Sequence, residues 1–189
     1  MGTRGLITFR VNGVNKAAYQ QFDAYPAGMG ITVLEFLRGG DLNLLKEAAA
    51  GHKVVDGNTP PTPEQIEALK GYANKNVDNG KLDNWYVLLR ETQGDPAAIL
   101  ACGYVEDSFA FGHDALFCEW AAVVDLDEGN FDLYSGFNNG PSVGLWSDQP
   151  EPTPSSSGYT SITRIASFPL TDLPSNEDFL AKVDPGGDE

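Results

Sequence analysis

The chain has 189 residues, about the size of one domain. It carries 27 acidic against 12 basic side chains, a formal net charge of −15, and 41% of its residues are hydrophobic. A sizeable core can therefore form, which excludes wholesale disorder. No apolar run approaches the roughly 20 residues that a membrane span needs, so no membrane association is expected. The acidic balance argues against direct nucleic-acid binding, and the lack of a signal-peptide pattern favours the cytoplasm.

The first half of the sequence begins with a predicted hairpin. Residues 6–11 alternate apolar and polar side chains, Asn12-Gly13 is a strong two-residue turn signal, and the return strand is expected over about 15–22. Residues 23–30 are predicted to form a loop, because Pro26 disfavours a helix through Tyr25 and two glycines follow.

Helical patterns fill the middle of the chain. A helix is predicted over 31–37, ending at two glycines, and a second from the cap Asp41 to about residue 50. Thr62 and Pro63 are typical of a third helix, which should run to about residue 73. Residues 82–91 fit a helix or a buried strand equally well, and a short apolar segment follows Asp95-Pro96.

The pattern becomes that of strands again after residue 116. Strands are predicted over 117–126, 131–134 and 159–168, with a turn at 127–130 and a surface loop at 150–158. Ser175 is expected to cap a final helix over about 176–182, and 185–189 should form a disordered acidic tail. We therefore predict one α+β domain over 1–184, with a mainly antiparallel sheet and a helical middle segment packed on it.

The negative charge lies almost wholly in the second half. Residues 1–100 hold 10 basic and 11 acidic side chains, whereas residues 101–189 hold two basic and 16 acidic ones. One interpretation is a solvated surface that maintains solubility, and the other is an acidic face that binds a basic surface of a partner protein. The candidate residues for such a face are Asp125, Asp127, Glu128 and Asp132.

Motifs for metal or cofactor chemistry are incomplete. Cys102 and Cys118 are 16 positions apart and are expected to be buried free thiols. The acidic run from residue 125 resembles a calcium loop, but its glycine comes one position early and Gly136 stands where a bidentate Glu is required. We therefore expect no metal and no cofactor.

One polar constellation remains as a candidate site. A hairpin centred on Asn12-Gly13 pairs positions whose numbers sum to about 25, which predicts an encounter of Arg4 with Asp23 at one end of the sheet. Tyr25 follows directly. This group is either a structural ion pair that orders the loop, or the floor of a polar pocket to which Glu119 also contributes.

Three short motifs carry a resemblance: GTRG at residues 2–5, FDAYPAG at 22–28 and EWAAVVDLD at 119–127. In these motifs the chain resembles a family of small phage, prophage and bacterial proteins of uncharacterised activity. The resemblance implies a phage-type accessory protein acting in the bacterial cytoplasm.

Two functional hypotheses follow. The first is a non-enzymatic binding protein, such as a counter-defence factor, that binds a host protein with a basic surface or a small ligand. The second is a small hydrolase or transferase, in which Arg4 holds an anionic group and Asp23 or Glu119 is the base in a pocket shared with Tyr25.

Overall fold

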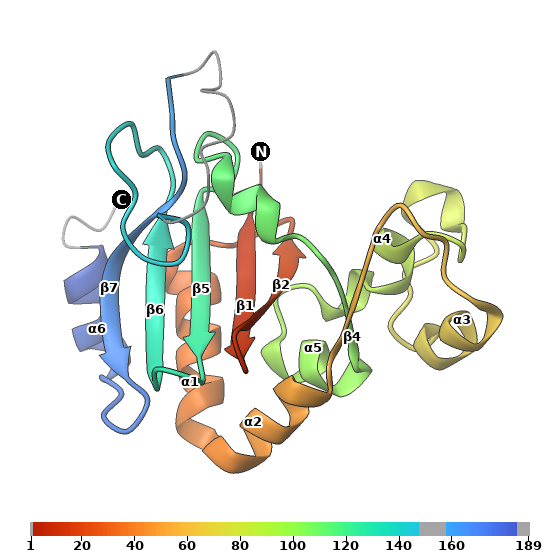
Figure 1. The fold of residues 1–189 in the computed structure, drawn as a ribbon, viewed down its shortest axis with the longest axis horizontal. Helices are drawn as coiled ribbons and strands as arrows, with labels where there is room; N and C mark the ends of the chain where they lie inside the picture. The colour runs from red at the N-terminus through yellow and green to blue at the C-terminus, as the bar shows by residue number, and fades with distance from the viewer. Residues whose placement is uncertain (1, 148–157, 185–189) are drawn as a thin grey trace.

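A five-stranded sheet forms the centre of the computed structural model, which describes residues 2–147 and 158–184 (Figure 1). The strands stand in the order β2-β1-β5-β6-β7, with the bounds β1 Gly5–Val11, β2 Val14–Gln20, β5 Trp120–Asp125, β6 Asn130–Ser135 and β7 Thr163–Pro169. Neighbouring strands are antiparallel except β1 and β5, which are parallel. The predicted α+β fold with a mainly antiparallel sheet is confirmed.

The first hairpin has the predicted register. Gly5 pairs with Gln20 and Val11 pairs with Val14, so the paired positions sum to 25. Asn12 and Gly13 both adopt positive φ angles, of 53° and 73°. That conformation matches the twist of the two strands, which is why Asn-Gly sequences favour tight hairpins.

Three helices cover one face of the sheet: α1 (Ile31–Gly39), α2 (Leu42–Gly51) and α6 (Asn176–Val183). The side chain of Asp41 caps α2 and that of Ser175 caps α6, as predicted. The main core lies between these helices and the sheet, where the ring of Phe179 stacks 5.8 Å from the ring of Phe131. Both rings are fully buried, so α6 is fixed to the centre of the sheet.

The other face of the sheet has a smaller core. Leu6, Val123 and Tyr134 pack there against Trp146, whose indole N–H donates to the carbonyl of Phe109 in the short helix η4 (Phe109–His113). This cover lies over the Leu6 end of β1. At the other end, the same face carries polar and charged side chains instead, beginning with Arg10.

The segment between α2 and η4 forms a lateral lobe beside the edge strand β2 (Figure 1). It contains a parallel pair of three-residue strands and five short helices: β3 Lys53–Val55, α3 Pro63–Leu69, η2 Asp78–Gly80, α4 Trp85–Leu88, η3 Arg90–Thr92, α5 Pro96–Cys102 and β4 Tyr104–Glu106. The lobe has its own core of Leu69, Trp85, Leu88 and Leu89. Among the described residues, no helix is long and apolar enough to cross a membrane.

Several local predictions need correction. Residues 23–30 are not all loop, because Pro26 opens a π-helical turn, η1 (Pro26–Gly30), that leads into α1; proline is tolerated at a first helical position because its missing N–H would have no partner there. The ambiguous segment 82–91 contains the short helix α4 and the start of η3 rather than a strand. The helix α3 ends at Leu69 rather than 73, and β5 and β7 begin at Trp120 and Thr163. The predicted tail and all but Gly158 of the predicted loop at 150–158 lie outside the described residues.

Candidate functional site

The structure brings Arg4 and Glu119 together. The backbone N–H of Arg4 donates to Oε1 of Glu119 at 3.3 Å, and the N–H of Glu119 donates to the carbonyl of Arg4 at 3.0 Å. The Arg4 guanidinium lies 4.8 Å from the centre of the Phe117 ring. The two residues thus extend the β1–β5 pairing by one step, and the Arg4 charge is held over an aromatic face.

Asp23 and Tyr25 flank Ala24, whose backbone N–H donates to the carbonyl of Thr3 at 3.2 Å, next to Arg4. Asp23 and Tyr25 line a cavity of about 630 Å³, and neither Arg4 nor Glu119 is among its lining residues. The two segments meet at one end of the sheet, but no ion pair joins Arg4 and Asp23 within the described residues. The reason is local: strand pairing ends at Gly5 and Gln20, and Asp23 then turns the chain with a φ of 57°.

We call this space the amide cavity, because four side-chain amides contribute to its wall. It lies between the end of β2, the η1 turn and the lobe. The lining residues are Gln20, Gln21, Phe22, Asp23, Tyr25, Gly28, Met29, Thr32, Asn74, Arg90, Glu91, Gln93, Gly94 and Asp95. With this volume it is large enough to hold a small organic molecule.

Gln20 is the most informative residue of the amide cavity. Its residue surface is only 5% exposed, and its Nε2 donates to the carbonyl of Phe22 at 2.6 Å. Its Oε1 is buried and has no hydrogen-bond partner among the described residues. A buried acceptor without a donor is costly, so a ligand that supplies an N–H or O–H here would gain that energy on binding.

The lobe side of the amide cavity is organised by Arg90 and Gln93. The backbone N–H of Gln21 donates to Oε1 of Gln93 at 3.2 Å, and the Arg90 guanidinium donates to the same oxygen. Arg90 also lies 5.4 Å from the ring centre of Phe22. These contacts connect β2 to the lobe across some 70 residues of sequence, so the two walls of the cavity are fixed relative to one another.

Two aromatic rings stand at the opening of the amide cavity. Phe22 is 52% and Tyr25 is 41% exposed, which is unusual for rings of this size. Gly28 allows the η1 turn to pack closely beneath them: a Cβ at Gly28 would lie 2.5 Å from the carbonyl oxygen of Asp23 and 3.1 Å from the Tyr25 ring. Only glycine fits this position without displacement of the turn.

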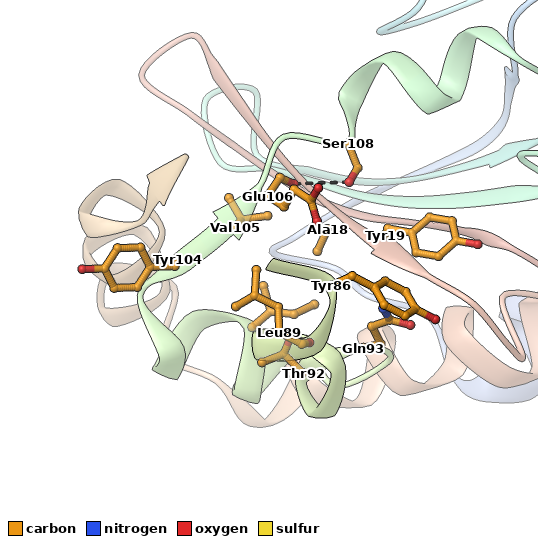
Figure 2. A pocket seen from close by; sticks show the side chains of 11 residues that line it. Ala18, Tyr19, Tyr86, Leu89, Thr92, Gln93, Tyr104, Val105, Glu106 and Ser108 are labelled. Carbon is orange, nitrogen blue, oxygen red and sulfur yellow. Dashed lines mark hydrogen bonds between the residues drawn. The ribbon is translucent and has the colours of Figure 1, made fainter. Parts of the chain in front are cut away.

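A smaller pocket of about 240 Å³ adjoins the amide cavity, and Gln93 lines both. Figure 2 shows Tyr19 and Tyr86 at one end of this pocket and Tyr104 at the other, with Leu89 between them. Glu106 also lines it. Burial raises the pKa of the Glu106 carboxyl, and the nearby charge of Asp56 raises it further.

The four predicted acidic-face residues do not form one exposed surface. Asp125 and Asp132 are buried, and each pairs with an arginine at 3.1 Å, Asp125 with Arg10 and Asp132 with Arg164. Asp127 and Glu128 are exposed at the β5–β6 turn. The correction has a simple cause: successive side chains of a strand point to opposite faces, and these two aspartates point to a face that is partly covered.

Asp127 has a structural role in this turn. Its carboxylate accepts the backbone N–H groups of Asn12 and Gly13, both at 2.8 Å, and these bonds lower its pKa. It therefore ties the β5–β6 turn to the β1–β2 turn. No group of three or more metal-binding side chains gathers anywhere in residues 2–147 and 158–184.

Sequence reasoning missed the lobe half of the amide cavity. Gln20, Gln21, Asn74, Arg90 and Gln93 are not among the candidate site residues that the sequence indicates. The polar run Arg90-Glu91-Thr92-Gln93-Gly94, directly after a buried helix, is the signal in the sequence that points to a surface feature there.

Comparisons with protein-family models, with curated proteins and with solved structures find no match to this chain. The geometry of the amide cavity is accordingly the principal basis for a functional assignment.

Proposed function

We propose that this chain is a non-enzymatic binding protein that holds a small polyhydroxylated ligand, such as a sugar or the ribose of a nucleoside, in the amide cavity. The observation that carries the proposal is Gln20 Oε1, a buried acceptor with no partner among the described residues, at the wall of a cavity of about 630 Å³. Such an atom is stabilised when a ligand supplies the missing donor.

The other lining groups suit hydroxyl groups. A side-chain amide both donates and accepts hydrogen bonds, as a hydroxyl does, and Gln21, Gln93 and Asn74 supply three further amides. Asp23 adds a carboxylate acceptor at the cavity wall. The exposed rings of Phe22 and Tyr25 offer apolar faces against which the C–H face of a sugar or a base can pack.

The placement of the candidate residues favours binding over the hydrolase or transferase hypothesis. That hypothesis needs Arg4, Asp23, Tyr25 and Glu119 in one pocket. Asp23 and Tyr25 line the amide cavity, whereas Arg4 and Glu119 bond to each other outside its lining. The hypothesis places Arg4 beside Asp23 as the group that holds an anionic substrate, and Arg4 is not among the residues that line the amide cavity.

The biological setting is part of the proposal and has a separate basis. The motifs at residues 2–5, 22–28 and 119–127 resemble those of phage and prophage proteins, and they support an accessory protein of the bacterial cytoplasm. The FDAYPAG motif contributes Phe22, Asp23, Tyr25 and Gly28 to the amide cavity. A counter-defence protein that sequesters a small ligand would fit both observations.

Saturation-transfer NMR against a panel of glucose, N-acetylglucosamine, ribose, adenosine and uridine tests this function. We expect at least one compound to bind, and Gln20→Leu to weaken that binding about tenfold, which corresponds to the roughly 1.4 kcal/mol of one hydrogen bond to a buried acceptor. Phe137→Ala is the matched control, because Phe137 is an exposed aromatic outside the amide cavity. Absence of binding by the whole panel, or equal binding by Gln20→Leu, contradicts the proposal.

A further inference from the structure

A second cavity lies on the open face of the central sheet, and we call it the strand-face cavity. Its volume is about 400 Å³, and its lining comprises Arg10, Gly13, Asn15, Val123, Asp125, Glu128, Asn130, Asp132, Tyr134, Gly144, Leu145 and Arg164. It lies at the Arg10–Asp125 end of the sheet, whereas the amide cavity lies at the Gly5–Gln20 end. The two cavities share no lining residue.

Asp132 is the key residue of the strand-face cavity. Its side chain is only 5% exposed, and its Oδ2 accepts a hydrogen bond from Nη1 of Arg164 at 3.1 Å. Its Oδ1 is buried and has no partner among the described residues. A carboxylate oxygen removed from water without a donor is among the costliest unsatisfied groups in a protein interior.

Asp125, by contrast, is fully satisfied. Its Oδ2 bonds to Arg10 at 3.1 Å, and its Oδ1 accepts the backbone N–H groups of Asp127 and Glu128. The two buried aspartates of the hairpin therefore differ in one respect: Asp125 has donors for both oxygens and Asp132 has a donor for one. The protein itself supplies hydrogen-bond donors for both carboxylate oxygens of Asp125, but it supplies none for Oδ1 of Asp132 within the described residues.

The charge and the donors of the cavity point to the same kind of ligand. Three carboxylates and two guanidinium groups line it, which leaves a formal charge of −1. The Oδ1 of Asn15 is a second buried acceptor without a partner among the described residues. Burial raises the pKa of Tyr134 to about 12, so its hydroxyl is neutral at physiological pH and adds no negative charge. Among the described residues, the cavity therefore lacks a donor for Oδ1 of Asp132 and for Oδ1 of Asn15, and it carries one uncompensated negative charge.

We propose that the strand-face cavity binds a small primary amine as its ammonium ion, with Asp132 Oδ1 accepting one of the ammonium hydrogens. An ammonium group supplies one positive charge and only donors, which matches the unsatisfied oxygen of Asp132 and the charge of −1. A divalent metal fits less well, because no group of three or more metal-binding side chains is assembled within the described residues.

Isothermal titration calorimetry with n-butylammonium chloride, at constant ionic strength, tests this site. We expect saturable binding of one equivalent. Tetramethylammonium chloride is the comparison ligand, because it has the same charge and no N–H donor, and we expect no binding. If both cations bind alike, general attraction to an acidic protein accounts for the heat, and the proposal fails.

Two substitutions test whether n-butylammonium binds in the strand-face cavity. Asp132→Asn places an NH₂ group or an uncharged oxygen at the position of the unpartnered Oδ1, and should weaken n-butylammonium binding at least tenfold. Asp172→Asn removes the same formal charge from an exposed residue outside the cavity and should leave the affinity unchanged. An equal loss in both variants would overturn the assignment.

Asn15→Asp gives a result of opposite sign. It adds a carboxylate to the lining of the same cavity, three strands away from Asp132, and its longer-range attraction for the ammonium ion should strengthen n-butylammonium binding several-fold. A gain of affinity cannot come from damage to the fold, so this variant decides the question even where Asp132→Asn folds poorly. Unchanged or weaker binding by folded Asn15→Asp contradicts the proposal.

Discussion

Glu106 has a protonation equilibrium that couples directly to stability. Burial raises the pKa of its carboxyl, and repulsion from Asp56 raises it further. The folded protein therefore binds this proton more tightly than the unfolded chain does. It follows that the contribution of Glu106 to stability is greatest below about pH 4 and is lost as the pH rises through the raised pKa.

We therefore expect Glu106→Gln to raise the melting temperature at pH 7, because glutamine keeps the shape and removes the charge, and we expect this advantage to disappear at about pH 4. Thermal unfolding of both proteins across this range measures the difference. Glu47→Gln, at an exposed site on α2, is the control and should show no such pH dependence. An advantage of Glu106→Gln that does not change with pH would contradict the assignment to the carboxyl charge.

At the scale of elements, Lys16 joins the edge strand β2 to the end of α2. Its Nζ donates to the carbonyls of Ala49, Ala50 and His52, at 2.5, 3.0 and 2.8 Å. These carbonyls belong to the C-terminal end of the helix, where carbonyls lack the usual partners of the helix interior and a cation is favoured; that of Ala49 also accepts the N–H of His52. One side chain thus caps a helix and anchors a strand.

Lys16→Met keeps the length of the side chain and removes all three donors. We expect it to lower the free energy of unfolding by about 2 kcal/mol, the usual range for hydrogen bonds to a charged group. Urea unfolding measures the loss. Lys70→Met is the control, because Lys70 is exposed on the lobe and pairs with the exposed Glu67, and it should change stability by less than about 0.5 kcal/mol. Equal losses in the two variants would contradict the assignment of the stability loss to the three hydrogen bonds of Lys16.

The elements that the sequence predicts well are those with local signals. Asn12-Gly13 fixes a turn through its own backbone preferences, and Asp41, Thr62 and Ser175 cap helices within four residues of themselves. The strands β3 and β4 lack such signals: each has three residues, and their pairing joins Lys53 to Tyr104. The parallel pairing of β1 with β5 likewise depends on contacts over more than 100 residues.

The difference between local signals and long-range contacts also decides which parts of the candidate site are predictable from the sequence. Asp23 and Tyr25 follow a hairpin whose register is local, so their place at one end of the sheet was predictable. The position of the lobe was not, because it depends on how residues 53–106 pack beside β2. The orphan oxygen of Gln20 becomes visible only when both walls of the amide cavity are present.

At the scale of the whole molecule, the acidic second half is partly neutralised by the first. Arg10 in β1 pairs with Asp125 in β5, and the turn at Asn12 and Gly13 binds Asp127. The two halves are separate in the sequence, but the parallel pairing of β1 with β5 places the β1–β2 hairpin beside the acidic β5–β6 hairpin. Burial of Asp125 and Asp132 removes two of the 16 acids of residues 101–189 from the surface.

The net charge of −15 still implies repulsion across the folded surface. Raising sodium chloride from about 10 mM to about 100 mM shortens the screening length from about 30 Å to about 10 Å, so repulsion between distant carboxylates weakens. We expect this change at pH 7 to raise the melting temperature by about 2–4 °C, which corresponds to about 1 kcal/mol for a chain of this size. Near pH 4.3, the isoelectric point, the net charge vanishes and the effect should disappear. A melting temperature that falls with salt at pH 7 would instead show that ion pairs such as Arg10–Asp125 outweigh the repulsion.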